Sequence, residues 1–237
     1  MDQLKELVSK LEHAFQDRLV SVVLYGSGAS QDHDGKFSDL NVLCVLKDIT
    51  PRELADGEPI LKWWRAHGNP SPLLMTEEEA HNSADSFPIE FRDMQERRKV
   101  LHGPDVIAHL KIEGHYYRAQ VEHELRSKLL RLRQQGAAQL SHPEALLKLC
   151  LDSVSTFCVL GRHALLAGNI HAKSERRAVV HQLGKTLNAD MSSFDTLLDI
   201  REDKAGVDPG DPGELFARYL QSVQQMIKFV DGLEGKS

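Results

Sequence analysis

The chain has 237 residues and a formal net charge of −6 at neutral pH, which is enough length to bury the core of one large domain or two small ones. The acidic balance argues against nucleic acid as the main partner, because general nucleic-acid binders carry a basic excess. No uninterrupted apolar stretch reaches the roughly 18 residues of a membrane span, and the first residues lack an apolar signal core. We therefore expect a cytoplasmic protein with no membrane partner.

The cysteines and histidines indicate neither a disulfide framework nor a zinc site. Cys44, Cys150 and Cys158 lie in apolar segments without a Cys-x-x-Cys pair, which is typical of buried thiols in a reducing compartment. The 12 histidines form no His-x-His or His-x-x-x-His pair, so the spacing does not favour zinc.

The first elements are a helix and two apolar strands. Apolar residues recur at helical spacing from Leu4 to Phe15, which predicts an amphipathic helix over 2–17. The runs Leu19–Tyr25 and Leu40–Leu46 are rich in valine and leucine, as in buried strands, and we expect both in one sheet.

The segment between these strands carries the chemistry. Gly26 and Ser27 end the first run, and glycine there allows a backbone turn that a phosphate can approach. Side chains alternate along a strand, so Asp39 and Asn41 point to the same face. Two oxygen ligands on one face suit a hard cation such as Mg²⁺, which is commonly bound by carboxylates and substrate phosphates. The pattern predicts a site for a metal and a nucleotide.

Helix and strand signals alternate as far as residue 110. Thr50, Pro51 and Glu53 combine an N-cap, a first-turn proline and a capping-box acid, which predicts a helix running to about His67. Shorter signals predict a strand over 72–75, a helix that begins at Thr76, and a strand over 88–94 that contains Glu90.

Beyond Gly114 the strand signals vanish. Periodic apolar stretches predict five helices, at about 115–135, 143–167, 175–187, 192–201 and 212–232. We therefore divide the chain into an α/β domain over 1–110 and a helical bundle over 111–237.

Gly26 and Ser27, followed after a loop by Ser38, Asp39, Leu40 and Asn41, resemble the signature of the polymerase-beta-like nucleotidyltransferase superfamily. The resemblance covers residues from about 5 to 105. It implies an α+β fold with a mixed sheet, flanking helices and a third carboxylate on a later strand, for which Glu90 is the match. It further implies that Asp39 and Glu90 are catalytic and bind Mg²⁺, that Gly26, Ser27 and Ser38 form the nucleotide site, and that a nucleoside monophosphate passes from a nucleoside triphosphate such as ATP to an acceptor hydroxyl.

The sequence differs from that signature at Asn41, where the superfamily has a second aspartate. Asparagine offers an oxygen ligand without charge, so Asp39 and Glu90 alone would supply negative charge to the metal. Two interpretations follow: a Mg²⁺-dependent nucleotidyltransferase, and a nucleotide-binding or protein-interaction module that has lost the chemistry.

The helical half resembles, in architecture only, the second domain of aminoglycoside nucleotidyltransferases and of minimal nucleotidyltransferases with HEPN-like partners. The resemblance implies that the bundle walls the cleft and helps to select the acceptor, an unknown small molecule or protein that no motif identifies. Arg118 and His123 have the spacing of a HEPN ribonuclease pair, although a chain with 12 histidines produces such spacing by chance. Lys128 and Arg131 share one helix side, which we interpret as a solvated face.

Overall fold

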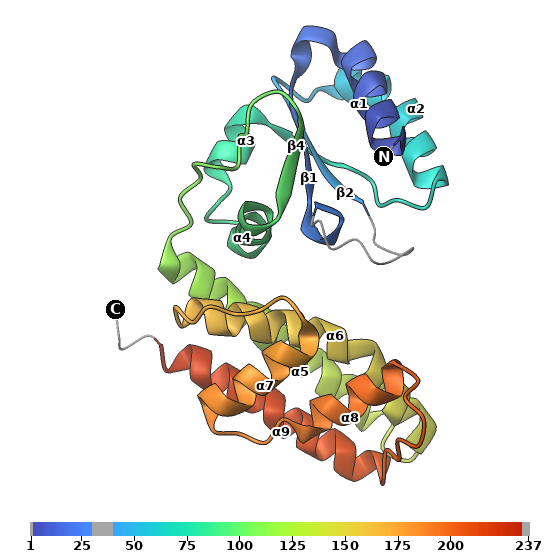
Figure 1. The fold of residues 1–237 in the computed structure, drawn as a ribbon, viewed down its shortest axis with the longest axis vertical. Coiled ribbons are helices and arrows are strands. Elements are labelled where there is room, and N and C mark those ends of the chain that lie inside the picture. The colour runs from blue at the N-terminus through green and yellow to red at the C-terminus, as the bar shows by residue number, and fades with distance from the viewer. Residues whose placement is uncertain (1, 30–39, 234–237) are drawn as a thin grey trace. The chain divides into compact units, whose positions relative to one another are not determined.

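The computed structural model describes residues 2–29 and 40–233. The chain divides into two compact units, residues 1–116 and 117–237 (Figure 1). The division falls in the first turn of helix α5 (Gly114–Ala137). The domain boundary near residue 110 stays a sequence-based prediction.

The first unit is built on a mixed sheet of four strands. The strands are β1 (Leu19–Tyr25), β2 (Asn41–Leu46), β3 (Leu73–Thr76) and β4 (Arg98–His102), in the order β3-β2-β1-β4. β1 is antiparallel to both β2 and β4, whereas β2 and β3 are parallel. The two apolar runs of the sequence are therefore the two central strands, which confirms that they share one sheet and that the fold is α+β.

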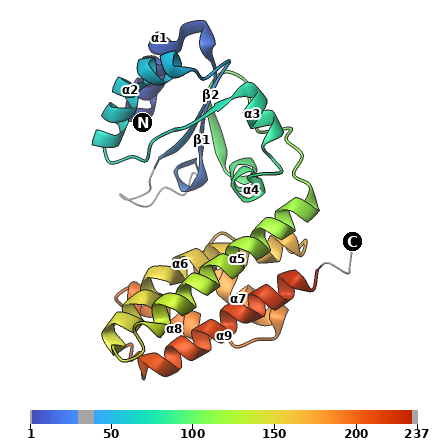
Figure 2. The same ribbon diagram turned by 180° about the vertical axis from the view of Figure 1, so that it is seen from behind.

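Helices cover both faces of this sheet, as Figure 1 and Figure 2 show. α1 (Asp2–Phe15) and α2 (Pro51–Ala66) pack on the face that carries Val22, Leu24 and Cys44. α3 (Glu77–Asn82) and α4 (Pro88–Glu96) cover the face that carries Val23, Leu43 and Val45. Because neighbouring strand residues point to opposite faces, an uninterrupted apolar run supplies both cores.

The start of α2 agrees with the sequence prediction. Thr50 is the N-cap, and its capping box with Glu53 is complete. The Arg18 guanidinium, from the short 3-10 helix η1 (Gln16–Arg18), bonds the buried Glu53 carboxylate and lies 2.8 Å from an Asp56 oxygen. This network attaches the segment before β1 to the first turn of α2.

The strand predicted over 88–94 is wrong: these residues form helix α4, and the strand is the next segment, β4. Ile89, Glu90 and Phe91 alternate as in a strand, but such a short window does not separate strand from helix. Pro88 occupies the first turn of α4, where its fixed φ suits a helix, and Phe91 and Met94 are buried three residues apart on one helix side.

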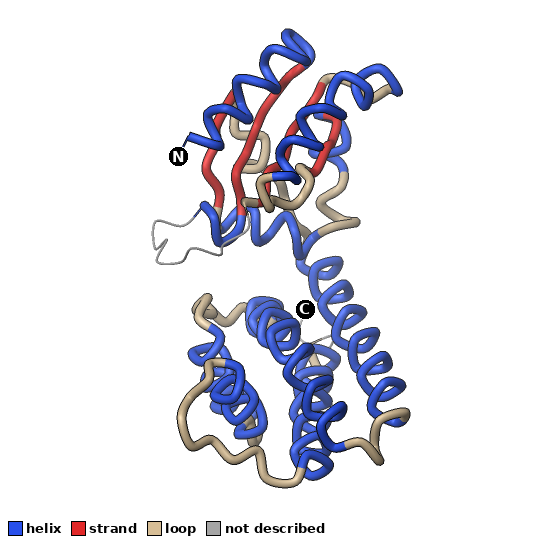
Figure 3. Tube along the Cα trace, turned by 90° about the vertical axis from the view of Figure 1, so that its right-hand side faces the viewer, coloured by secondary structure: helices blue, strands red, loops and turns tan. Residues whose placement is uncertain are grey.

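Every strand, red in Figure 3, belongs to the first unit, and in its described residues the second unit contains helices and loops but no strand. Its helices after α5 are α6 (Pro143–Ala167), α7 (Arg176–Leu187), α8 (Ser192–Arg201) and α9 (Pro212–Asp231), so the five predicted helices are confirmed. α6 contacts α7, α8 and α9 and contributes Val154 and Phe157 to the core. In the described part of the chain, no helix has the length and apolar character needed to cross a bilayer.

Candidate functional site

The described part of the candidate site lies where β1 ends and β2 begins. Gly26 follows β1, Asn41 opens β2, and Tyr25 is the residue paired with Asn41 across the ladder. Gly26 has a φ of +75°, a conformation that favours glycine, and a Cβ built on it would lie 3.5 Å from Asn41 Nδ2. The structure therefore places the glycine turn and Asn41 next to each other.

Backbone hydrogen bonding fixes the position of Gly26. Its N–H donates to the carbonyl oxygen of Arg97 at 3.0 Å, which connects the turn to the junction between α4 and β4. That N–H is thus already used within the protein, and the contribution of Gly26 to a ligand site is the conformation of the turn. The short 3-10 helix η2 (Gly26–Ala29), which contains Ser27, follows directly.

Glu90 comes to the same end of the sheet from a helix. Asn41 shares its sheet face with Leu43 and Val45, and α4 packs on that face through Phe91. The Glu90 side chain is exposed, and its carboxylate is near enough to act electrostatically on Tyr25. Burial and this negative charge together raise the pKa of the half-buried Tyr25 hydroxyl. Glu90 therefore lies on the face of Asn41 and Tyr25.

Ser38 and Asp39 lie outside the described residues, so their roles stay predictions. In the described part of the chain, no three His, Cys, Asp or Glu side chains form a group that could hold a metal ion. The Asn41 and Glu90 side chains make no hydrogen bond or ion pair to other described residues. The amide oxygen of Asn41 and the carboxylate of Glu90 are hard donors, so the chemistry of this pair fits a divalent cation.

Sequence reasoning missed two residues of this region, Tyr25 and Arg97. Tyr25 precedes the glycine turn and is paired with Asn41 across the ladder, so strand alternation places both side chains on one face once this pairing is known. Arg97 was missed because the strand prediction ended at residue 94, whereas the strand that brings Arg97 to Gly26 begins at Arg98.

The Arg118 and His123 pair does not form a shared site. Both residues lie on α5, five positions apart, which turns their side chains about 140° away from each other. The Arg118 guanidinium bonds Glu122 at 3.0 Å, and the His123 ring lies 3.5 Å from the Ser127 hydroxyl. This arrangement excludes the pair as facing residues of a HEPN-type ribonuclease site.

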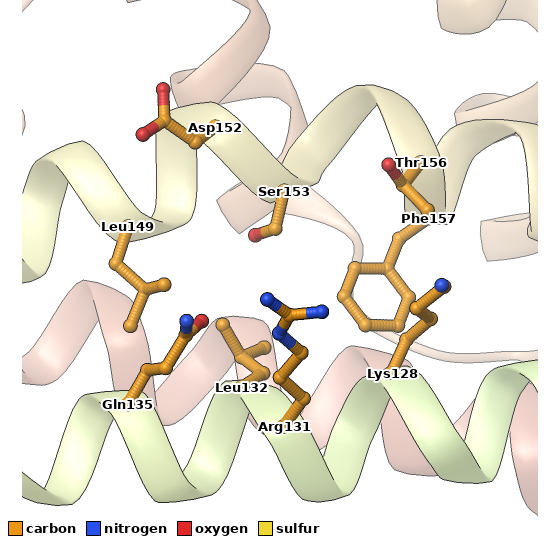
Figure 4. A pocket seen from close by; sticks show the side chains of 9 residues that line it. All are labelled: Lys128, Arg131, Leu132, Gln135, Leu149, Asp152, Ser153, Thr156 and Phe157. Atoms are coloured by element: carbon orange, nitrogen blue, oxygen red, sulfur yellow. The ribbon is translucent and has the colours of Figure 1, made fainter.

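Lys128 and Arg131 line a groove of about 310 Å³ between α5 and α6. Figure 4 shows both side chains rising from α5 towards the α6 residues Ser153 and Phe157. Both cations are exposed, and the Lys128 ammonium lies 3.7 Å from Glu124 on the same helix. The structure thus agrees with a solvated helix face.

The first unit is a mixed sheet with helices on both faces, and a helical unit follows it in the chain. Among solved structures, the chain is similar to spectinomycin adenyltransferase AAD(9) from Enterococcus faecialis, whose crystal structure contains ATP and spectinomycin. The TM-score is 0.59 at 10% sequence identity, and the similarity covers 94% of this chain and 99% of that chain. At this identity the similarity shows the fold alone. No protein-family model and no curated protein sequence matches the chain.

Proposed function

We propose that the protein is a Mg²⁺-dependent nucleotidyltransferase that transfers a nucleoside monophosphate from a nucleoside triphosphate, ATP foremost, to an acceptor hydroxyl. The observation that carries this proposal is the convergence of the Gly26 turn, Asn41 and Glu90 at one end of the sheet of a nucleotidyltransferase-type fold. The similar structure that holds ATP supports the choice of nucleotide.

Each candidate residue has a defined role in this proposal. The turn at Gly26 and Ser27 binds the β and γ phosphates, and Ser38 orients the loop that follows. Asp39, Asn41 and Glu90 hold the metal, with Asn41 as a neutral ligand. Mg²⁺, when bound, polarises the phosphates and stabilises the charge that develops on the leaving group.

The reaction is a displacement at the α-phosphorus. The acceptor oxygen forms a bond to this phosphorus, the bond to the oxygen that bridges the α and β phosphates breaks, and pyrophosphate leaves. The acceptor hydroxyl must lose a proton in this step. The exposed Glu90 carboxylate can accept that proton, because it carries negative charge and points to solvent beside Tyr25.

The acceptor in this proposal is a small molecule that carries hydroxyl groups. This choice is supported by the similar structure, which contains spectinomycin. The similarity covers nearly the whole length of both chains. Spectinomycin is therefore the first acceptor to test, followed by other aminocyclitols and aminoglycosides.

Asn41 favours a second candidate function, a nucleotide-binding module without turnover. A neutral ligand in place of a carboxylate weakens the electrostatic attraction for a second cation, on which two-metal phosphoryl transfer depends. The two functions differ in one observable, the release of pyrophosphate.

The test is a pyrophosphate-release assay on the full chain with ATP, Mg²⁺ and spectinomycin or an acceptor mixture. We expect acceptor-dependent release, and we expect Glu90→Gln to reduce the rate by roughly a hundredfold or more, as for loss of a general base. Glu78→Gln, an exposed substitution on the neighbouring helix α3, is the matched control and should retain activity. ATP binding without release would favour the module, and equal rates for wild type and Glu90→Gln would remove Glu90 from the reaction.

A further inference from the structure

Three polar side chains form a row across the sheet, at the end where the glycine turn lies. Arg98 in β4 is paired with Tyr25 in β1, and Tyr25 is paired with Asn41 in β2. Residues paired across antiparallel strands carry their side chains on the same face, so we call these three residues the polar row. The next row on this face is entirely apolar and consists of Val100, Val23 and Leu43. The polar row therefore borders the core at the candidate site.

The Tyr25 hydroxyl is a donor that the surrounding residues do not use. The side chain is half-buried, and its hydroxyl makes no hydrogen bond to another residue in 2–29 and 40–233. Burial and the negative charge of Glu90 raise the pKa of this hydroxyl, so it keeps its proton at neutral pH. A protonated phenol can donate a hydrogen bond to a ligand that lies on this face.

The Arg98 guanidinium is held in one orientation by neighbouring residues of the first unit. Its Nε lies 3.0 and 2.9 Å from the two carboxylate oxygens of Asp105, and its Nη1 donates to the Gln95 carbonyl. Asp105 Oδ1 also accepts the N–H groups of Ile107 and Ala108, each at 3.1 Å. The Arg98 side chain is 21% exposed, and its Nη2 has no hydrogen bond within the described ranges. Arg98 therefore offers a fixed donor group, which a ligand can bind at little cost in side-chain entropy.

The chemistry of the two side chains suits an oxyanion. The phenol O–H and the guanidinium N–H groups only need acceptors, and phosphate oxygens are acceptors that carry negative charge. The exposed Glu90 carboxylate lies at the same end of the sheet, and the positive charge of Arg98 reduces its repulsion of a phosphate. Gly26, which the proposed function assigns to the β and γ phosphates, follows Tyr25 directly in the chain.

We propose that Tyr25 and Arg98 bind the β and γ phosphates of the nucleoside triphosphate and give the site its preference for triphosphates over monophosphates. This assignment rests on the proposed function, and it adds two residues that the Gly-Ser pattern does not contain. Its basis is the strand register that places both side chains beside Asn41, together with donors that the described residues leave unused.

The test is calorimetric titration of ATP, AMP and inorganic tripolyphosphate into the full chain, with Mg²⁺. Tyr25→Phe removes only the hydroxyl, so its thermal unfolding should match that of wild type. We expect it to weaken ATP and tripolyphosphate binding by roughly tenfold and AMP binding by less than about threefold. Arg98→Gln should weaken ATP and tripolyphosphate binding by roughly ten- to a hundredfold, again with a smaller effect on AMP.

Two matched controls lie outside the polar row and should bind ATP as wild type does. Tyr116→Phe removes an exposed hydroxyl on α5. Lys99→Gln removes an exposed cation of β4 whose partner, Leu24, belongs to the opposite face of the sheet.

The outcomes separate this assignment from the proposed function. If wild type binds ATP and either Tyr25→Phe or Arg98→Gln binds it equally well, the assignment is wrong while the proposed function stands. An equal loss of ATP and AMP binding would also overturn the assignment, because the two side chains would then not act on the β and γ phosphates. If wild type binds no nucleotide, the proposed function fails and the assignment fails with it.

Discussion

Asn41 is the residue whose chemistry separates the two candidate functions. It lies at the start of β2, paired with Tyr25 and in contact distance of the Gly26 position. Its amide oxygen can bind a cation but adds no negative charge. An aspartate has nearly the same shape, so a substitution here changes the charge of the site with little change in packing.

We therefore expect Asn41→Asp to raise the Mg²⁺-dependent affinity for ATP by roughly tenfold, equivalent to about 1.4 kcal/mol. The reason is the added carboxylate, which strengthens attraction to the cation. Titration of ATP at fixed Mg²⁺ measures this change, and titration without Mg²⁺ is the control, in which the variant should bind no better than wild type. A lower affinity in Mg²⁺ would show that Asn41 does not act as a metal ligand.

Glu53 gives a prediction on stability and pH. Hydrogen bonds from the Thr50 hydroxyl and from Arg18 lower the pKa of the Glu53 carboxyl from its ordinary 4.5 to about 2. A lowered pKa means that the stabilisation is present above about pH 4.5 and is lost as the pH falls towards 2. In this window the unfolded chain binds up to about one more proton at this group than the folded chain does.

The variant Glu53→Gln should lose that part of the pH dependence. Urea unfolding between pH 2.5 and 7 should give a lower stability than wild type at neutral pH and a flatter curve below pH 4.5. Glu78→Gln controls for loss of one exposed carboxylate. Parallel curves for wild type and Glu53→Gln would contradict the bonding of Glu53 to Arg18 and Thr50.

Among the elements, those with strong local signals agree with their sequence predictions. The run Leu19–Tyr25 is β1 from end to end, because its apolar and β-branched residues, interrupted by Ser21 alone, are followed by Gly26, whose φ of +75° turns the chain. Helix α2 begins after Thr50, because the capping box satisfies its first N–H groups. The segment 88–102 was not predictable in this way. Its helix and strand are both short, and their order depends on pairing between β4 and the distant β1.

Gly103, which follows β4, tests how tightly this edge of the sheet is packed. It has a φ of +71°, and a Cβ there would lie 2.0 Å from the carbonyl oxygen of Val20 in β1. The neighbour is backbone, so the clash cannot be relieved by a side-chain rotation. We expect Gly103→Ala to lower the free energy of unfolding by roughly 3 kcal/mol or more, combining a strained φ with overpacking.

Gly68→Ala separates these two causes. Gly68 has a φ of +83° but no heavy atom near its hypothetical Cβ, so only backbone strain acts, at about 1 kcal/mol. Chemical unfolding of the two variants measures the difference. If both lose the same stability, the close approach of Gly103 to β1 is not as the structure places it.

At the scale of the whole molecule, all described residues of the candidate site belong to the first unit. The sequence predicted some of these residues and missed others. Gly26 and Asn41 were predicted from the Gly-Ser turn coupled to the Ser-Asp-Leu-Asn segment, and the structure places these two residues side by side. Glu90 was placed on a strand but lies on a helix, because the positions of α4 and β4 depend on pairing between β4 and the distant β1. Asp39 lies outside the described residues, so its role is tested by measuring ATP binding to the Asp39→Ala variant.

The most direct test of the nucleotide site is calorimetric titration of ATP into wild type and Asp39→Ala, each with and without Mg²⁺. We predict that wild type binds ATP more tightly with Mg²⁺ and that Asp39→Ala loses this dependence while its thermal unfolding is unchanged. Titration of GTP, CTP and UTP under the same conditions is the control, and their affinities relative to ATP give the base preference of the site. Failure of every triphosphate to bind wild type, or equal Mg²⁺-dependent binding by Asp39→Ala, would contradict a metal–nucleotide site at the Gly26 turn.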